Sequence, residues 1–251
     1  MGAGHQFSQW AILSLLFRFR VRKKTSAIGV ATNKTLDSAS PDFCWVDHGR
    51  VIQFYPGKTP WNAIDPNLVV DEKGLGYLVF GSFWDGLKLV KLTRDFLLPA
   101  EEIDNIPTVA SRKKDISGKK AVADNHSANA GDNAIEAPFI FKKGAYFYFF
   151  ASIDYCCRGE KSTYKVIIGR SKKLQGPYVD KDGVALRNGG GSVFLQGDKN
   201  WYGVGHNGVF SAGGKDYIVY HGYDPADGGK SKLRIRKLTW DAKGWPVTGD
   251  L

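Results

Sequence analysis

The chain has 251 residues, of which 43% are apolar, and this is enough to bury a substantial core in one large domain or two small ones. Its net charge of +10 comes from 35 basic and 25 acidic residues. The basic residues are scattered over turns such as 111–114 and 118–120, not gathered on one helix or stacking platform, so no nucleic-acid partner is expected.

The first 24 residues differ from the rest of the chain. They show little turn chemistry or strand alternation, and they end in a dense basic cluster at 18–24. The apolar stretch 10–17 is too short to span a bilayer, and no small-residue cleavage site follows it. We therefore expect no membrane span and recognise no signal peptide. The chain is divided into an atypical segment, 1–24, and one domain, 25–251.

The remaining segments read as strands and turns, because long helical periodicity is hard to find. Residues 26–32 predict a strand, and residues 42–52 predict a strand pair around Trp45. The polar connection at about 100–133 predicts a long surface loop. All-β is the favoured class.

Three short segments place an ionisable residue just before strand-forming residues, roughly 70 residues apart. They are 62–66 with Asp65, 134–138 with Glu136, and 203–207 with His206. Each is followed by a short apolar segment, a glycine-containing turn and an aromatic-rich strand. Such a repeat is typical of a β-propeller. If the first strand of each repeat lines the axis, Asp65, Glu136 and His206 point into one central funnel.

The two carboxyl groups are candidates for acid–base chemistry. Glu136 lies between Ala134-Ile135 and Ala137-Pro138, and an apolar frame raises a carboxyl pKa and keeps a proton available for a general acid. Asp65 has a comparable frame, and two carboxyls on one rim would hold their titrations apart. The alternative is that both are strand-end residues that cap turns.

His206, between Gly205 and Asn207, is a candidate to ligate a metal ion or to orient a carboxylate, or is a polar core residue. The segment 81–86 places large aromatic residues beside small ones, as sugar-stacking sites do. The same aromatics could equally pack between blades.

The three cysteines, Cys44 and the neighbours Cys156 and Cys157, form neither a disulfide framework nor a zinc motif. Since adjacent cysteines can join only through a small strained ring, buried free thiols are expected.

Together these segments resemble the endo-1,5-α-L-arabinanases of glycoside hydrolase family 43 over most of residues 25–250. The sharpest matches are Asn62-Ala63-Ile64-Asp65-Pro66-Asn67, Gly81-Ser82-Phe83-Trp84, Glu136-Ala137-Pro138-Phe139, Cys156-Cys157-Arg158-Gly159 and Ser162-Thr163-Tyr164-Lys165.

The resemblance implies a five-bladed β-propeller that hydrolyses arabinan, a plant cell-wall polysaccharide, with inversion, and it implies secretion. Glu136 matches the general acid, and Asp65 matches the carboxylate that orients it and tunes its pKa. His206 matches an axial histidine near a bound ion, commonly Ca²⁺, in the channel. The positions that match sugar-contacting segments are Asn62, Ala63, Ile64, Asp65, Ser82, Phe83 and Trp84.

The sequence departs from the family at the general base, which is expected in a His-Asp-Pro-like setting in the first blade. No such segment occurs here, and Asp47 is a poor substitute. We therefore expect a propeller that is truncated or altered at its first blade. We expect this propeller to be an arabinan hydrolase whose own activity is reduced. The alternatives are a catalytically silent glycan-binding propeller and an exo-acting arabinofuranosidase or xylosidase.

Overall fold

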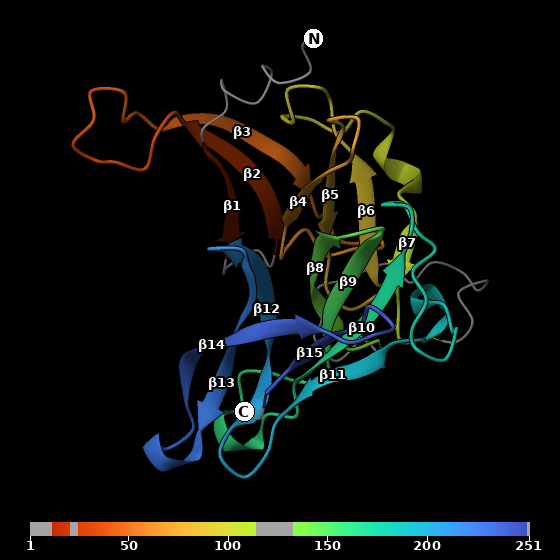
Figure 1. Cartoon of the computed structure of the whole chain (residues 1–251). Helices are drawn as coiled ribbons and strands as arrows, with labels where there is room; N and C mark the ends of the chain where they lie inside the picture. The colour runs from red at the N-terminus through yellow and green to blue at the C-terminus, as the bar shows by residue number, and fades with distance from the viewer. Residues whose placement is uncertain (1–11, 21–24, 114–132, 250–251) are drawn as a thin grey trace.

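The computed structural model describes residues 12–20, 25–113 and 133–249, and its strands form four antiparallel sheets arranged around a common centre (Figure 1). The first sheet has three strands: β1 (Ile12–Arg20), β2 (Thr25–Asn33) and β3 (Val46–Gln53). The second has four: β4 (Asn67–Val70), β5 (Gly76–Phe80), β6 (Leu87–Lys91) and β7 (Thr108–Ala110).

The third and fourth sheets also have four strands each. The third contains β8 (Ile135–Lys143), β9 (Tyr146–Ile153), β10 (Lys165–Ser171) and β11 (Ser192–Gln196). The fourth contains β12 (Tyr202–Ala212), β13 (Lys215–Asp224), β14 (Lys230–Trp240) and β15 (Pro246–Thr248). In the described part of the chain, short 3₁₀ helices lie in the connections: η1 (Ile103–Asn105), η3 (Gly159–Lys161), η4 (Leu186–Asn188) and η5 (Pro225–Asp227). Within every sheet the strands follow chain order, so each sheet is a meander.

Three apolar clusters join the four sheets face to face, because alternate residues of a strand point to opposite faces. In β9, Phe147 and Phe149 pack toward the second sheet, whereas Tyr148 and Phe150 pack toward the fourth. A third cluster joins the first sheet to the second through Ile28 and its neighbours. The outer face of the fourth sheet carries exposed apolar side chains, among them Leu233 and Ile235.

The predicted all-β, radially repeated fold is confirmed. Among the described residues there are four sheets, where the resemblance implies five blades, and the first sheet has three strands. Two local predictions were wrong: residues 42–52 supply the single strand β3, and β7 lies inside the segment expected to be a loop. Most of that loop, at 114–132, lies outside the described residues.

The segment 1–24 contains a strand that the sequence pattern did not predict: β1 pairs with β2 along its whole length, from Ile12 opposite Asn33 to Arg20 opposite Thr25. The domain boundary at residue 24 stays a prediction. In the described residues no helix is long and apolar enough to cross a membrane.

Candidate active site

The start of β4 and interior parts of β8 and β12 line a pocket of about 430 Å³. Each contributes three consecutive residues: Asp65 to Asn67, Ala137 to Phe139, and His206 to Gly208. The first residue of each trio has a left-handed backbone, with φ of 54° at Asp65, 52° at Ala137 and 52° at His206. Such a conformation is uncommon outside glycine. Because the left-handed conformation recurs at these three positions, it marks them as equivalent residues of a structural repeat.

This repeat corrects the alignment made from the sequence. The position equivalent to Asp65 and His206 is Ala137, and Glu136 lies one residue earlier. Because Ala137 has a left-handed backbone and the pairing of β8 with β9 shifts register between Glu136 and Phe139, Glu136 has surroundings of its own. The shared apolar-then-proline pattern of 64–66 and 135–138 had suggested equivalence of the two acids.

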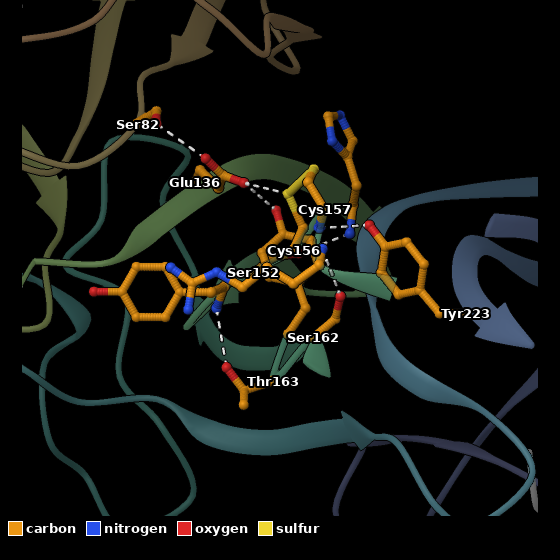
Figure 2. The surroundings of a disulfide bond; sticks show 12 residues. Ser82, Glu136, Ser152, Cys156, Cys157, Ser162, Thr163 and Tyr223 are labelled. Carbon is orange, nitrogen blue, oxygen red and sulfur yellow. Dashed lines mark hydrogen bonds between the residues drawn. A yellow bond between two sulfur atoms is a disulfide. The ribbon is translucent and has the colours of Figure 1, made fainter. Parts of the chain in front are cut away.

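The Glu136 carboxylate is held by two hydroxyl groups. Its Oε2 accepts a hydrogen bond from Ser82 Oγ at 3.0 Å, and its Oε1 accepts one from the Tyr164 hydroxyl at 2.7 Å. The Sγ atom of Cys156 lies 3.9 Å from the same Oε1 (Figure 2). Ser82 also forms an antiparallel bridge with Glu136 across two sheets. The carboxyl group is therefore fixed in orientation while the residue stays partly accessible.

Asp65 lies next to this group. Its Oδ2 accepts a hydrogen bond from the Ala137 N–H at 3.0 Å, which ties the second sheet to the third. Burial raises the pKa of Asp65 to about 6; the charge of His206 lowers this pKa, and that of Glu136 raises it. The structure thus brings Asp65, Glu136 and His206 into one electrostatic neighbourhood.

His206 is exposed, and its backbone N–H donates to Ser152 Oγ at 2.8 Å. A second histidine, His221 on β13, lies behind it and stacks on the Tyr164 ring with centroids 5.7 Å apart. Burial, and then the charge of His206, lowers the pKa of His221 to about 4. His221 is therefore neutral at neutral pH.

The residues present do not form a calcium cage. Among the described residues, no group of three or more His, Cys, Asp or Glu side chains could hold a metal ion. Calcium takes six to eight oxygen ligands, so one imidazole at His206 does not fit it.

The segment before Asp65 is anchored to the first sheet. Asn62 Oδ1 accepts a hydrogen bond from the Ser26 hydroxyl at 2.6 Å, and the N–H of the fully buried Ala63 donates to Ser26 Oγ at 3.2 Å. The carbonyl of Ile64 accepts a hydrogen bond from the Gly81 N–H at 2.9 Å. These bonds place 62–65 beside the loop that carries Ser82.

That loop is itself well fixed. The Phe83 N–H donates to the Ile135 carbonyl at 2.8 Å, one residue before Glu136. Phe83 also faces the ring of Tyr155, with centroids 6.2 Å apart. Trp84 stacks on Phe54 at 6.1 Å, and its carbonyl accepts a hydrogen bond from Asn133 Nδ2 at 2.8 Å. Ser82 and Phe83 thus border the site, whereas Trp84 packs against the apolar cluster between the first and second sheets. The contact of all three residues with sugar stays a prediction.

Sequence reasoning missed three participants. Tyr164 was named only as part of a matching motif, because a tyrosine just before a strand gives no sign in the sequence of the acid that it contacts. His221 was not named as a candidate. Cys156 and Cys157, expected to be free thiols, are joined by a disulfide, and Cys44 is the free, exposed cysteine.

Comparison with known proteins gives a family and a set of relatives. The family model described as Glycosyl hydrolases family 43 matches residues 10–246. The extracellular exo-α-(1→5)-L-arabinofuranosidase ArbA of Cellvibrio japonicus is 47% identical over 224 residues, which are 89% of this chain and 62% of that protein. The extracellular endo-α-(1→5)-L-arabinanase 1 of Bacillus subtilis is 37% identical over 88% of this chain and 60% of its own length. The chain therefore spans less than two thirds of these two relatives.

A solved structure, that of the Cellvibrio cellulosa α-L-arabinanase complexed with arabinohexaose, superposes with a TM-score of 0.85 at 44% identity. The match covers 96% of this chain and 75% of the other.

Proposed function

Since the chain belongs to glycosyl hydrolase family 43, we propose that it binds arabinan and acts on its α-1,5-arabinofuranosidic bonds, with Glu136 as the general acid. The observation that carries the proposal is the pair of hydroxyl donors, Ser82 and Tyr164, that hold the Glu136 carboxyl beside Asp65. Relatives named as an exo-arabinofuranosidase and an endo-arabinanase, and a relative solved with arabinohexaose, support the substrate class.

In this mechanism Glu136 donates its proton to the glycosidic oxygen as the bond to the leaving sugar breaks. Proton transfer requires that oxygen within about 2.6–3.2 Å of the carboxyl group. Asp65 is the positioning carboxylate: through its charge it interacts with Glu136, and through the Ala137 N–H it holds the strand that carries Glu136.

Inversion also requires a carboxylate that activates water, about 6.5–9.5 Å from the acid. The sequence has no His-Asp-Pro-like segment to supply it. We therefore expect hydrolysis that is slower by a factor of about 10²–10⁴ than with both groups present. The same observation favours a second candidate function, glycan binding without hydrolysis.

The deciding experiment measures reducing ends released from linear arabinan by the purified protein, and binding of arabinohexaose by calorimetry. Release that Glu136→Gln abolishes, and that the exposed control Glu101→Gln leaves intact, supports the hydrolase. Binding without release supports the glycan-binding candidate. If the protein neither binds nor hydrolyses arabinan, both candidates are overturned. Monosaccharide as the sole product would assign exo action, and a ladder of oligosaccharides endo action.

Two further expectations, secretion and a channel ion, rest on resemblance to relatives. Secretion is proposed because the two curated relatives are named extracellular. The Ca²⁺ that the family resemblance implies near His206 does not fit the side chains that the described residues offer there, and no step above depends on it. Binding and release that fall after chelation with EDTA would show that an ion is bound all the same.

A further inference from the structure

The Cys156–Cys157 disulfide lies directly beside the proposed acid. Cys156 Sγ is 3.9 Å from Glu136 Oε1, the oxygen that also accepts the Tyr164 hydroxyl (Figure 2). Cys157 is exposed and Cys156 is half-buried, so part of the disulfide faces the solvent next to the carboxyl group.

The surrounding loop holds the disulfide in a fixed place. Cys157 has a left-handed backbone, with φ of 65°, and its N–H donates to the Tyr223 hydroxyl at 2.7 Å. The next N–H, that of Arg158, donates to Ser162 Oγ at 3.0 Å. These two bonds tie the cysteine pair to the fourth sheet and to the chain segment that leads into Tyr164.

An apolar border continues from the disulfide. Tyr155, the residue before Cys156, is 39% exposed, and its ring faces Phe83 across the site. The guanidinium of Arg158 lies over the Tyr155 ring, 4.2 Å from its centroid. The disulfide beside the carboxyl group is thus followed along the loop by a pair of aromatic rings, and such apolar surfaces suit the C–H faces of a sugar ring.

We propose that the Cys156–Cys157 disulfide is a wall of the sugar subsite next to Glu136 and contacts the pentose on one side of the scissile oxygen. This inference rests on the proposed function. If the scissile oxygen lies about 3 Å from the carboxyl group, as proton transfer requires, one of the two sugars that it joins lies beside Cys156. The disulfide presents a fixed apolar surface without S–H donors, whereas two thiols would rotate independently and offer weak hydrogen bonds to Glu136.

Reduction supplies a reversible test. Tris(2-carboxyethyl)phosphine breaks the S–S bond; the phosphine is oxidised to the phosphine oxide with the oxygen of one water, and that water's two protons complete two thiols. Thiol titration reports the state of the protein, because the oxidised chain has one free cysteine and the reduced chain has three.

The measurement is the affinity for arabinohexaose by calorimetry of the oxidised, reduced and reoxidised protein, with Cys44→Ser as the matched control. We expect reduction to raise Kd about fivefold or more, with recovery on reoxidation and no effect of Cys44→Ser. The double variant Cys156→Ser/Cys157→Ser should match the reduced protein, and thermal unfolding checks that it is folded.

The experiment distinguishes a failure of the role proposed for the disulfide from a failure of the proposed function. An unchanged Kd in protein with three titratable thiols would overturn the role of the disulfide and leave the proposed function standing. An oxidised wild-type protein that does not bind arabinohexaose would overturn both. Where hydrolysis is measurable, a sugar-contacting role predicts a rise in KM that exceeds the fall in kcat.

Discussion

Tyr164 donates its hydroxyl hydrogen to Glu136 Oε1 at 2.7 Å from a side chain that is only 1% exposed. Burial and the nearby charge of Glu136 raise the pKa of Tyr164 well above its ordinary value of 10. The phenol therefore keeps its proton at neutral pH and remains a donor throughout the proposed reaction. Since the ring is buried, Tyr164 acts through Glu136 and not on the sugar.

The first prediction is that Tyr164→Phe lowers kcat on linear arabinan about 10–100-fold with little change in KM. Hydrogen bonds to charged groups contribute about 1.5–3 kcal/mol, and the loss falls on the orientation of the acid. Tyr178→Phe is the matched control: Tyr178 is equally buried, but its hydroxyl donates to the Leu174 carbonyl, away from Glu136. A Tyr164→Phe protein with wild-type kcat would show that Glu136 is held by its other contacts.

The second prediction concerns pH. The pKa of Asp65 rises from 3.8 to about 6 on folding, so the native state binds more protons than the unfolded state between these values. The stabilisation is fully present below about pH 4, and it is lost as pH rises through about 6. The loss is roughly 1–3 kcal/mol.

Asp65→Asn should remove this dependence, because the amide oxygen can still accept the Ala137 N–H but does not ionise. Urea unfolding of both proteins from pH 4 to pH 8 measures it: the variant should gain stability relative to the wild type as pH rises. Parallel curves for the two proteins would mean that Asp65 is solvated in the native state.

Much of the fold followed from the sequence because strand alternation and spacing are local signals. The apolar pattern of β9, for instance, places Phe147 and Phe149 on one face and Tyr148 and Phe150 on the other, and both faces are covered in the structure. The strand β1 was missed because its alternating residues, Phe17-Arg18-Phe19-Arg20, were interpreted as part of a basic cluster.

The sequence predicted that Asp65, Glu136 and His206 lie near one another, and they do, although their alignment was wrong by one residue. Their roles stay predictions. Asp65, Glu136 and His206 lie together, yet the repeat aligns Asp65 and His206 with Ala137. The one-residue offset is present in the sequence, where Pro66 directly follows Asp65 but Pro138 follows Ala137, and the backbone dihedral angles agree with it. Tyr164 and the disulfide lie in sequence 28 and 20 residues after Glu136, and only the pairing of β8 with β9 and of β9 with β10 brings them to it.

The third prediction concerns Lys88, whose fully buried side chain forms an ion pair with Asp85 and donates to Thr108 Oγ1 at 2.6 Å. This pair supports the loop that carries Ser82. Lys88→Met should destabilise the protein by about 3 kcal/mol, because it leaves the Asp85 carboxylate without its cation in a poorly solvated place.

The double variant Lys88→Met/Asp85→Asn should recover a large part of that stability, since no buried charge then remains. Chemical denaturation of the two single variants and the double variant completes the cycle. Additive effects in this cycle would contradict a direct coupling between Lys88 and Asp85.

The fourth prediction compares the two faces of the last sheet. Ile218 on β13 is fully buried in the cluster shared with the third sheet, whereas Leu233 on the neighbouring β14 is 72% exposed on the outer face. Ile218→Ala should cost about 2–5 kcal/mol through lost burial and the cavity left behind. Leu233→Ala should change the free energy of unfolding by less than about 0.5 kcal/mol, because surface substitutions have small effects. Urea denaturation at protein concentrations from about 1 to 100 µM checks both values. A Leu233→Ala cost that approaches that of Ile218→Ala would show that the outer face is covered in solution, and a cost that grows with protein concentration would assign the cover to a second copy of the chain.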